Sequence, residues 1–339
     1  MKILTCVPKQ HYTFEEKLEW LETQIKKHKP KIVVTPQEYF GGDYIMPEQS
    51  TFTEEELLPV LLELSDKYDV GLIVGLIERE NKKNYERMWF IDGELKGKIT
   101  KFVEPAYSLK GVGTYGLVQE DNLDNRFVNF EIKGALVSGF FCWEIYSDLL
   151  MSGLALLDLD FCVSQIKFGI SAAPKKEKLP NGLVKVGGIN FFKDTNWERR
   201  LRVANEFELK CPIVISTNSW DIPEKADHLY GVLDIFTDHD VKKATQEDIE
   251  KGVVEITDLD LNKTRGTREH WSSYLERVGE MPPGFLRQYT MMWKVYNRER
   301  KLIKGDREKV YKYLRKQVAY KKLLNKGDEL SKLVNETRR

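Results

Sequence analysis

The chain has 339 residues, of which 41% are hydrophobic and 31% charged, a composition typical of a soluble globular protein. This length exceeds one ordinary domain, but it suits a single large α/β domain with an appendage. Lysine plus arginine and aspartate plus glutamate both total 53, so no global charge favours nucleic acid or a membrane as a partner.

The spacing of cysteines and histidines limits which kinds of metal site or disulfide the chain can form. The four cysteines lie at least 20 positions apart without a CxxC pair, and the five histidines form no HExxH pattern. This distribution argues against a metal site or a disulfide framework and favours a reducing compartment. The N-terminus lacks the apolar core of a signal peptide, and no run approaches the ~18 apolar residues of a membrane span. We therefore expect a cytoplasmic protein.

The first 77 residues predict alternating strands and helices. Short apolar runs predict strands over residues 2–7, 31–35 and 70–77. Between them, the capping boxes Thr13–Glu16 and Thr53–Glu56 start two helices that run to about residues 27 and 68. This β-α-β-α-β order indicates helices packed on a sheet.

From residue 85 the pattern changes to antiparallel pairing. Strands are predicted over 85–91 and 94–102, joined by Asp92-Gly93, a type I′ hairpin signal. Further elements follow in chain order: strands over 127–132, 135–141 and 158–164, an irregular segment over 166–196, a helix over 196–209, and strands over 212–217 and 253–258. A loop as long as residues 166–196 is more often functional than idle.

Beyond residue 265 the character of the chain changes, so we predict two parts, residues 1–265 and a largely helical, basic extension over 266–339. Between Arg300 and Lys322, ten lysines and arginines accompany only two acids. We expect a solvated basic face there, with nucleic-acid binding as the minority alternative. An apolar stripe, Val310, Leu314 and Val318, needs a covering surface, which favours self-association.

Three candidate functional residues each follow a predicted strand: Glu38, Lys101 and Cys142. Glu38 precedes the turn Gly41-Gly42. Cys142 lies where a strand meets a helix-like pattern, and a helix N-terminus favours the thiolate form of a nearby cysteine. Taken alone, Cys142 is more simply interpreted as a buried structural cysteine, since free cysteines are among the most buried residues.

In this order the three residues resemble the Glu-Lys-Cys triad of the nitrilase, or carbon–nitrogen hydrolase, superfamily. The resemblance covers nearly all of residues 1–265 and rests on four segments: Pro36-Gln-Glu38, Gly97-Lys-Ile-Thr-Lys101, Cys142-Trp-Glu144 and residues 197–218. The chain also departs from the family. The usual Arg-Ala-x-Glu-Asn reads Arg202-Val-Ala-Asn-Glu206, Ile145 follows Glu144 in place of the Asn of the nitrilase branch, and no glutamate lies seven or eight residues after Lys101.

The resemblance implies a four-layer α-β-β-α sandwich with a C-terminal helical extension, assembled into dimers or larger homo-oligomers. It implies hydrolysis of a non-peptide C–N bond, amides ahead of nitriles, through an acyl-enzyme and without a metal or organic cofactor. Cys142 would be the nucleophile, Glu38 the base, and Lys101 the group that stabilises the anion developing on the substrate.

Something must also hold the flexible side chain of Lys101 in place. Glu104 is the nearest following carboxylate, and Glu144 or a downstream acid such as Glu120 is the alternative. The simpler interpretation of Glu104 is a solvated loop carboxylate. We expect the substrate pocket to include Tyr39, Trp143, Glu144 and Asn218.

Two other functional classes remain open from the sequence. One is a nitrilase-fold binding or scaffold protein without turnover. The other, a remote one, is a papain-like protease, for which the first histidine after Cys142 is His228.

Overall fold

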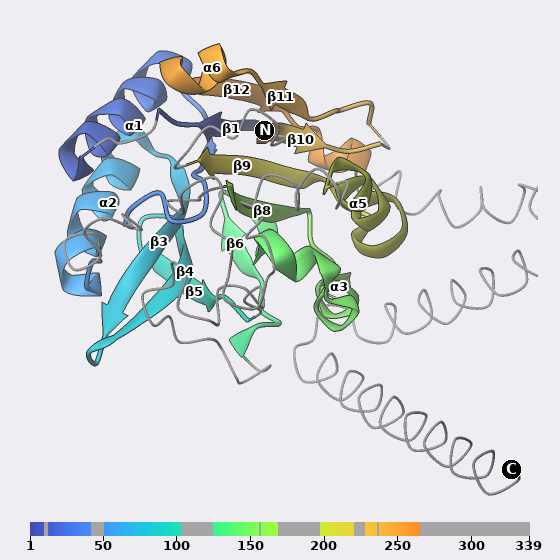
Figure 1. The fold of residues 1–339 in the computed structure, drawn as a ribbon, viewed down its shortest axis with the longest axis horizontal. Helices are drawn as coiled ribbons and strands as arrows, with labels where there is room; N and C mark the ends of the chain where they lie inside the picture. Colours follow the sequence, from blue (N-terminus) through green and yellow to red (C-terminus); the bar gives the residue numbers. More distant parts are fainter. Residues whose placement is uncertain are drawn as a thin grey trace, which may run out of the picture.

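Two six-stranded sheets carry the fold in the computed structural model, which describes residues 1–9, 13–41, 51–102, 125–155, 157–168, 197–219, 228–235 and 237–264 (Figure 1). The first sheet has the order β12-β1-β2-β3-β4-β5 and the second β11-β10-β9-β8-β7-β6. In each sheet three parallel strands lie side by side in the middle, with antiparallel strands on both flanks.

The strands of the first sheet are β1 (Lys2–Val7), β2 (Ile32–Val34), β3 (Gly71–Glu80), β4 (Lys83–Ile91), β5 (Leu95–Thr100) and β12 (Val253–Asp258). Those of the second sheet are β6 (Phe130–Ile132), β7 (Ala135–Phe141), β8 (Phe161–Phe168), β9 (Ile213–Ser219), β10 (His228–Leu233) and β11 (Lys242–Ala244).

Side-chain alternation along the strands builds the layers. In β8, Phe161 and Val163 lie in the core cluster between the two sheets, whereas Cys162 and Ile166 lie in the cluster on the outer face of the second sheet. Both faces of each central strand are thus buried, which explains why these strands are nearly continuous apolar runs.

Helices cover both outer faces (Figure 1). On the first sheet lie α1 (Phe14–His28) and α2 (Glu54–Tyr68), and on the second α3 (Asp148–Ala155) and α5 (Trp197–Val203). Both predicted capping boxes are present, at Thr13 and Thr53. The predicted α-β-β-α sandwich is therefore confirmed, whereas the predicted extension over 266–339 lies outside the described residues.

Several predicted boundaries were wrong. The β8 strand begins at Phe161 and continues past Ser164 to Phe168, because its inward polar residues find partners on the other sheet. A three-residue connection with Gly93 at φ 65° replaces the predicted two-residue hairpin turn. The helix predicted over 196–209 is α5 followed by a π-helical turn, Ala204–Leu209.

Three short elements had not been predicted: β10, β11 and α6 (Gln246–Lys251). None of the helices in the described part of the chain is long and apolar enough to cross a membrane.

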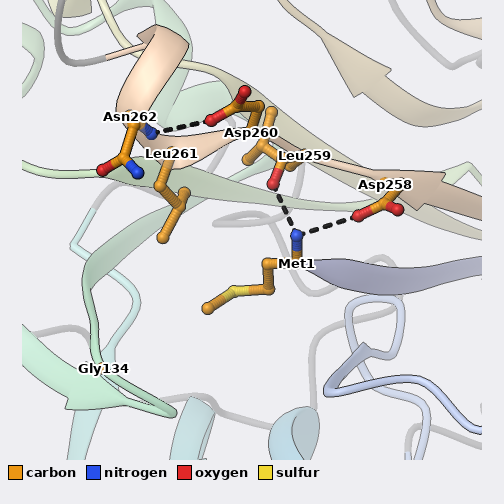
Figure 2. A pocket seen from close by; sticks show the side chains of 7 residues that line it. All are labelled: Met1, Gly134, Asp258, Leu259, Asp260, Leu261 and Asn262. Carbon is orange, nitrogen blue, oxygen red and sulfur yellow. Dashed lines mark hydrogen bonds and ion pairs between the residues drawn. The ribbon is translucent and has the colours of Figure 1, made fainter.

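A hollow lies at the amino ends of the strands (Figure 2). Its lining includes Met1 before β1, Gly134 before β7, and Asp258 at the end of the antiparallel β12. The amino group of Met1 donates to Asp258 Oδ1 at 2.9 Å and to the carbonyl of Leu259 at 2.6 Å. The predicted functional residues follow the carboxyl ends of strands, so this hollow lies at the opposite end of the sandwich.

Candidate active site

Glu38, Lys101 and Cys142 lie at one end of the sandwich, just beyond β2, β5 and β7. All three are buried, with exposed fractions of 3%, 5% and 3%. Glu38 and Lys101 come from the first sheet and Cys142 from the second. Any site they form is therefore built across the space between the two sheets, at the carboxyl ends of strands, where open α/β sheets commonly bind ligands.

Residues 34–38, here called the Glu38 segment, are held from the second sheet by a ladder of polar side chains. Ser216 Oγ donates to the carbonyl of Val34 at 2.6 Å, and Gln165 Nε2 donates to that of Thr35 at 2.9 Å. Asn218 Nδ2 donates to the carbonyl of Gln37 at 3.5 Å. The carbonyls of Val34, Thr35 and Gln37 thus each have a donor from the second sheet, as buried backbone groups require.

The first sheet holds the same segment from its other side. The backbone N–H of Thr35 donates to the carbonyl of Ile73 at 3.0 Å, and just beyond the segment that of Phe40 donates to the carbonyl of Gly75 at 3.1 Å. The segment that carries Glu38 is therefore fixed along both edges, which preorganises the carboxylate.

Four buried charged side chains lie at this end of the sandwich. We call them the four-charge cluster: Glu38, Glu86, Lys101 and Lys167. The Lys167 ammonium forms an ion pair with Glu38 Oε2, and Lys101 Nζ contacts Glu86 Oε2 at 2.8 Å. Burial lowers the pKa of Lys167 against the opposing effect of the Glu38 carboxylate, and the charges of Glu86 and Lys101 also act on this group. The two pairs are therefore electrostatically coupled.

Glu86 and Lys167 are residues that the sequence reasoning missed. Glu86 lies opposite Lys101, whose N–H donates to the carbonyl of Glu86 at 2.9 Å, and it shares the inward face of β4 with Met88 and Phe90. The sequence did contain a signal for Glu86: a charged residue at a position where strand alternation points the side chain inward, beside apolar residues. Lys167 has the same phase in β8 as Phe161 and Val163, but the predicted strand ended before it.

Among the described residues, the carboxylate that pairs with Lys101 is Glu86. Glu104, the predicted partner, and Glu120 lie outside the described residues, and Glu144 is engaged elsewhere.

Backbone strain marks two of the predicted residues. Glu38 has φ 53° and Cys142 φ 32°, in the left-handed region that side-chain-bearing residues rarely adopt. Cys142 begins a 3-10 turn, Cys142–Tyr146, and α3 starts only after it, so the helix does not follow the strand directly as predicted. Such strain costs about 1–3 kcal/mol per residue and clusters at functional sites.

Glu144 clamps the Lys101 and Cys142 regions together. Its Oε1 accepts the N–H of Phe102 at 2.5 Å, and its Oε2 accepts the N–H of Phe141 at 2.8 Å. Arg126 donates to the same carboxylate and, at 2.9 Å, to the carbonyl of Gly139. One fully buried carboxylate thus joins the residue after Lys101 to the residue before Cys142, and it is placed in this clamp rather than on an open pocket surface.

Two other predicted pocket residues can be located. Tyr39 lies in the core between the first sheet and its helices, and its hydroxyl donates to the carbonyl of Lys17 at 2.8 Å. Asn218 is buried at the end of β9 against the Glu38 segment. Nothing is described of the Trp143 side chain. The described residues contain no group of three or more His, Cys, Asp or Glu side chains arranged to hold a metal ion.

Gly75 tests how firmly the Glu38 segment is held. A Cβ at this position would lie 2.2 Å from the carbonyl oxygen of Pro36 and 2.9 Å from Gln37 Cα, both backbone atoms. We expect Gly75→Ala to lower the free energy of unfolding by about 1–3 kcal/mol, measured by urea denaturation. Glu131→Ala, at an exposed position in β6, is the control and should change it by less than about 0.5 kcal/mol. Equal stability of Gly75→Ala and wild type would show that the segment moves away without cost.

Glu144→Gln tests the clamp. The amide keeps the size but removes the charge opposite buried Arg126 and places N–H groups where acceptors are needed. We expect a loss of about 3–5 kcal/mol in the free energy of unfolding. Glu247→Gln, which breaks the exposed pair with Lys251, should cost less than about 1 kcal/mol. Similar small losses in both variants would contradict a clamp at Glu144.

Comparison with known proteins supplies a fold relationship. No family model matches the sequence, and no curated protein matches it. Among solved structures, a carbon–nitrogen hydrolase from Helicobacter pylori is similar, with a TM-score of 0.57 and 17% identity over 82% of this chain and 96% of that one.

Two further structures give the same result. Saccharomyces cerevisiae Nit3, of the nitrilase superfamily, has a TM-score of 0.56 and 11% identity over 84% of this chain and 96% of its own. A mutant amidase from Nesterenkonia, carrying the product of Michael addition of acrylamide at its active-site cysteine, has a TM-score of 0.52 and 10% identity over 81% of this chain and 99% of its own. The chain therefore has the fold of the carbon–nitrogen hydrolase, or nitrilase, superfamily.

Proposed function

We propose that this protein is a thiol-dependent hydrolase of non-peptide carbon–nitrogen bonds, acting on amides ahead of nitriles. The observation that carries the proposal is the convergence of a buried carboxylate, a buried ammonium and a strained cysteine at one end of a nitrilase-type sandwich. Amides rank first because an amidase is among the similar structures.

Glu38 and Cys142 begin the reaction. A free thiol is only about 3% thiolate at pH 7, so the nucleophile needs a base. Glu38 takes the thiol proton, and the Cys142 sulfur attacks the amide carbon. The negative charge that develops on the amide oxygen is stabilised by the Lys101 ammonium, a type of contribution worth about 3–4 kcal/mol.

Collapse of this intermediate breaks the C–N bond. The proton held by Glu38 passes to the leaving nitrogen, so ammonia or an amine departs and a thioester to Cys142 remains. Glu38 then removes a proton from water, whose oxygen attacks the thioester. The acid product leaves as the C–S bond breaks, and Glu38 passes the proton taken from water to the sulfur, which restores the Cys142 thiol.

Glu86 gives Lys101 a defined position in this scheme. The ion pair at 2.8 Å fixes a side chain that has four rotatable bonds and no intrinsic preorganisation. The ammonium therefore does not need to reorganise when the oxyanion forms.

A nitrilase-fold binding protein without turnover is the second candidate. The observation that favours it is the ion pair between Lys167 and Glu38, which engages one oxygen of the proposed base. Ammonia release from short aliphatic and ω-amides separates the two functions. Absence of turnover on a broad amide and nitrile panel, together with no acyl adduct by intact-mass measurement, would favour the binding protein.

Cys142→Ser should abolish ammonia release with little change in melting temperature, because a hydroxyl is a far poorer nucleophile near neutral pH. The matched control is Cys162→Ala, whose thiol is buried in the outer core of the second sheet and should be dispensable for turnover. Retained activity in Cys142→Ser with loss in a stably folded Cys162→Ala protein would assign the nucleophile to Cys162 instead.

Alkylation should select the same residue. Burial raises the pKa of the Cys6 and Cys162 thiols well above their ordinary range, so both stay protonated and unreactive near pH 8. We expect iodoacetamide to modify Cys142 in the folded protein, with peptide mass spectrometry locating the adduct, and to modify Cys6 and Cys162 only after unfolding in urea. Modification of Cys162 before Cys142 in the folded protein would contradict this order.

A further inference from the structure

Lys167 is the member of the four-charge cluster that the proposed reaction does not use. Its side chain is buried near the carboxyl end of β8, and its ammonium contacts Glu38 Oε2. The residue is 129 positions from Glu38 in sequence, and no sequence motif pointed to it.

Charge balance shows why a second lysine is present. Glu86 and Lys101 form one pair at 2.8 Å whose charges sum to zero, so the buried Glu38 carboxylate adds one negative charge that the Lys167 ammonium balances. A buried carboxyl group with no cation beside it would stay protonated, because burial disfavours the charged form. A protonated Glu38 cannot accept the thiol proton, so a base at this position requires another cation.

We infer that Lys167 is a positioning residue of the site, which holds Glu38 as an oriented carboxylate ready to receive the proton of Cys142. This inference rests on the proposed function for its catalytic consequence. Lys167 of β8 is in contact with Glu38, and Glu86 of β4 and Lys101 from the end of β5 act electrostatically on Lys167. Cys142 lies in the turn after β7.

The sign of the effect follows from the charges. The Lys167 ammonium contacts the Glu38 carboxylate, and an opposite charge at contact distance stabilises an ionised carboxylate. The acid limb of the kcat/KM profile should therefore move to higher pH in Lys167→Met, by about one to three units, the usual effect of an opposite charge at contact distance. In Lys167→Arg the charge remains, and the limb should stay near its wild-type position while kcat falls, because a planar guanidinium fits the ammonium site poorly.

A turnover-independent measurement keeps this inference separate from the proposed function. The protonated carboxyl of Glu38 has an infrared C=O stretch that can be followed against pH, with Glu38→Gln as the subtracted reference. The midpoint should rise in Lys167→Met as the acid limb does. If the wild type hydrolyses no amide or nitrile, the proposed function fails, yet this titration still decides the role of Lys167.

Lys98→Met is the matched control. Lys98 also pairs with a buried glutamate, Glu78, but outside the four-charge cluster. This variant should alter stability without moving the Glu38 titration or the acid limb. An unmoved titration in a folded Lys167→Met protein, or an equal shift in Lys98→Met, would overturn the inference.

A double variant covers the case in which Lys167→Met folds poorly. Lys167→Met combined with Glu86→Gln removes one charge of each sign, so the remaining pair, Glu38 and Lys101, is again neutral. We expect the double variant to melt at a higher temperature than Lys167→Met alone, a coupling that the double-mutant cycle measures. Additive losses of stability would show that Lys167 contributes packing only, and would reject the charge-balance argument.

Discussion

At the end of the sandwich that carries Glu38, the described buried charges occur in balanced pairs, and the arrangement there depends on that constraint. A lone ion in a closely packed interior is far too costly, whereas a paired and hydrogen-bonded one is tolerated. Glu38 and Glu86 face Lys167 and Lys101, and Glu144 faces Arg126. Each pair joins different elements, so neutralising the charges also fixes where those elements lie.

The two sheets contribute complementary parts of the site. The first supplies Glu38 and Lys101, and the second supplies Cys142 and the polar side chains that hold the Glu38 segment. Ser216, Gln165 and Asn218 donate to successive stretches of that segment, and Lys167 completes the series at Glu38 itself. These four side chains and the Glu38 segment form a polar seam between the two sheets. Elsewhere the space between the sheets is filled by apolar side chains. The left-handed backbone at Glu38 lies within this held segment, and that at Cys142 directly follows Phe141, whose N–H donates to Glu144.

Much of the architecture could be predicted from local sequence, because caps and strand alternation are local signals. The capping boxes at Thr13 and Thr53 place α1 and α2 within a residue or two. The layer order came from the family resemblance, and the structure has it. Positions of Glu38, Lys101 and Cys142 after strands could likewise be predicted, since each follows an apolar run.

The partners of these residues could not be predicted from spacing. Glu86 was within reach, because its register opposite Lys101 follows from the hairpin once the three-residue connection is known. Lys167 was not, since Gln165 and Lys167 interrupt an apolar run and only the opposite sheet explains them. The role of Glu144 was not predicted either. It was expected to line the substrate pocket, because nothing in the local sequence identifies Arg126 as its partner.

The long sequence separations across the seam bear on how the chain is made. Asn218 follows its acceptor residue Gln37 by 181 positions. At a synthesis rate of 5–20 residues per second, the ribosome adds Asn218 roughly 10–35 s after it adds Gln37. During that interval β1, β2 and β3 with their two helices can form, but their inner face has no second sheet against it. The nascent first half therefore exposes the polar Glu38 segment and the apolar inner strands to the ribosome surface and to chaperones, and it acquires its interior only late in translation.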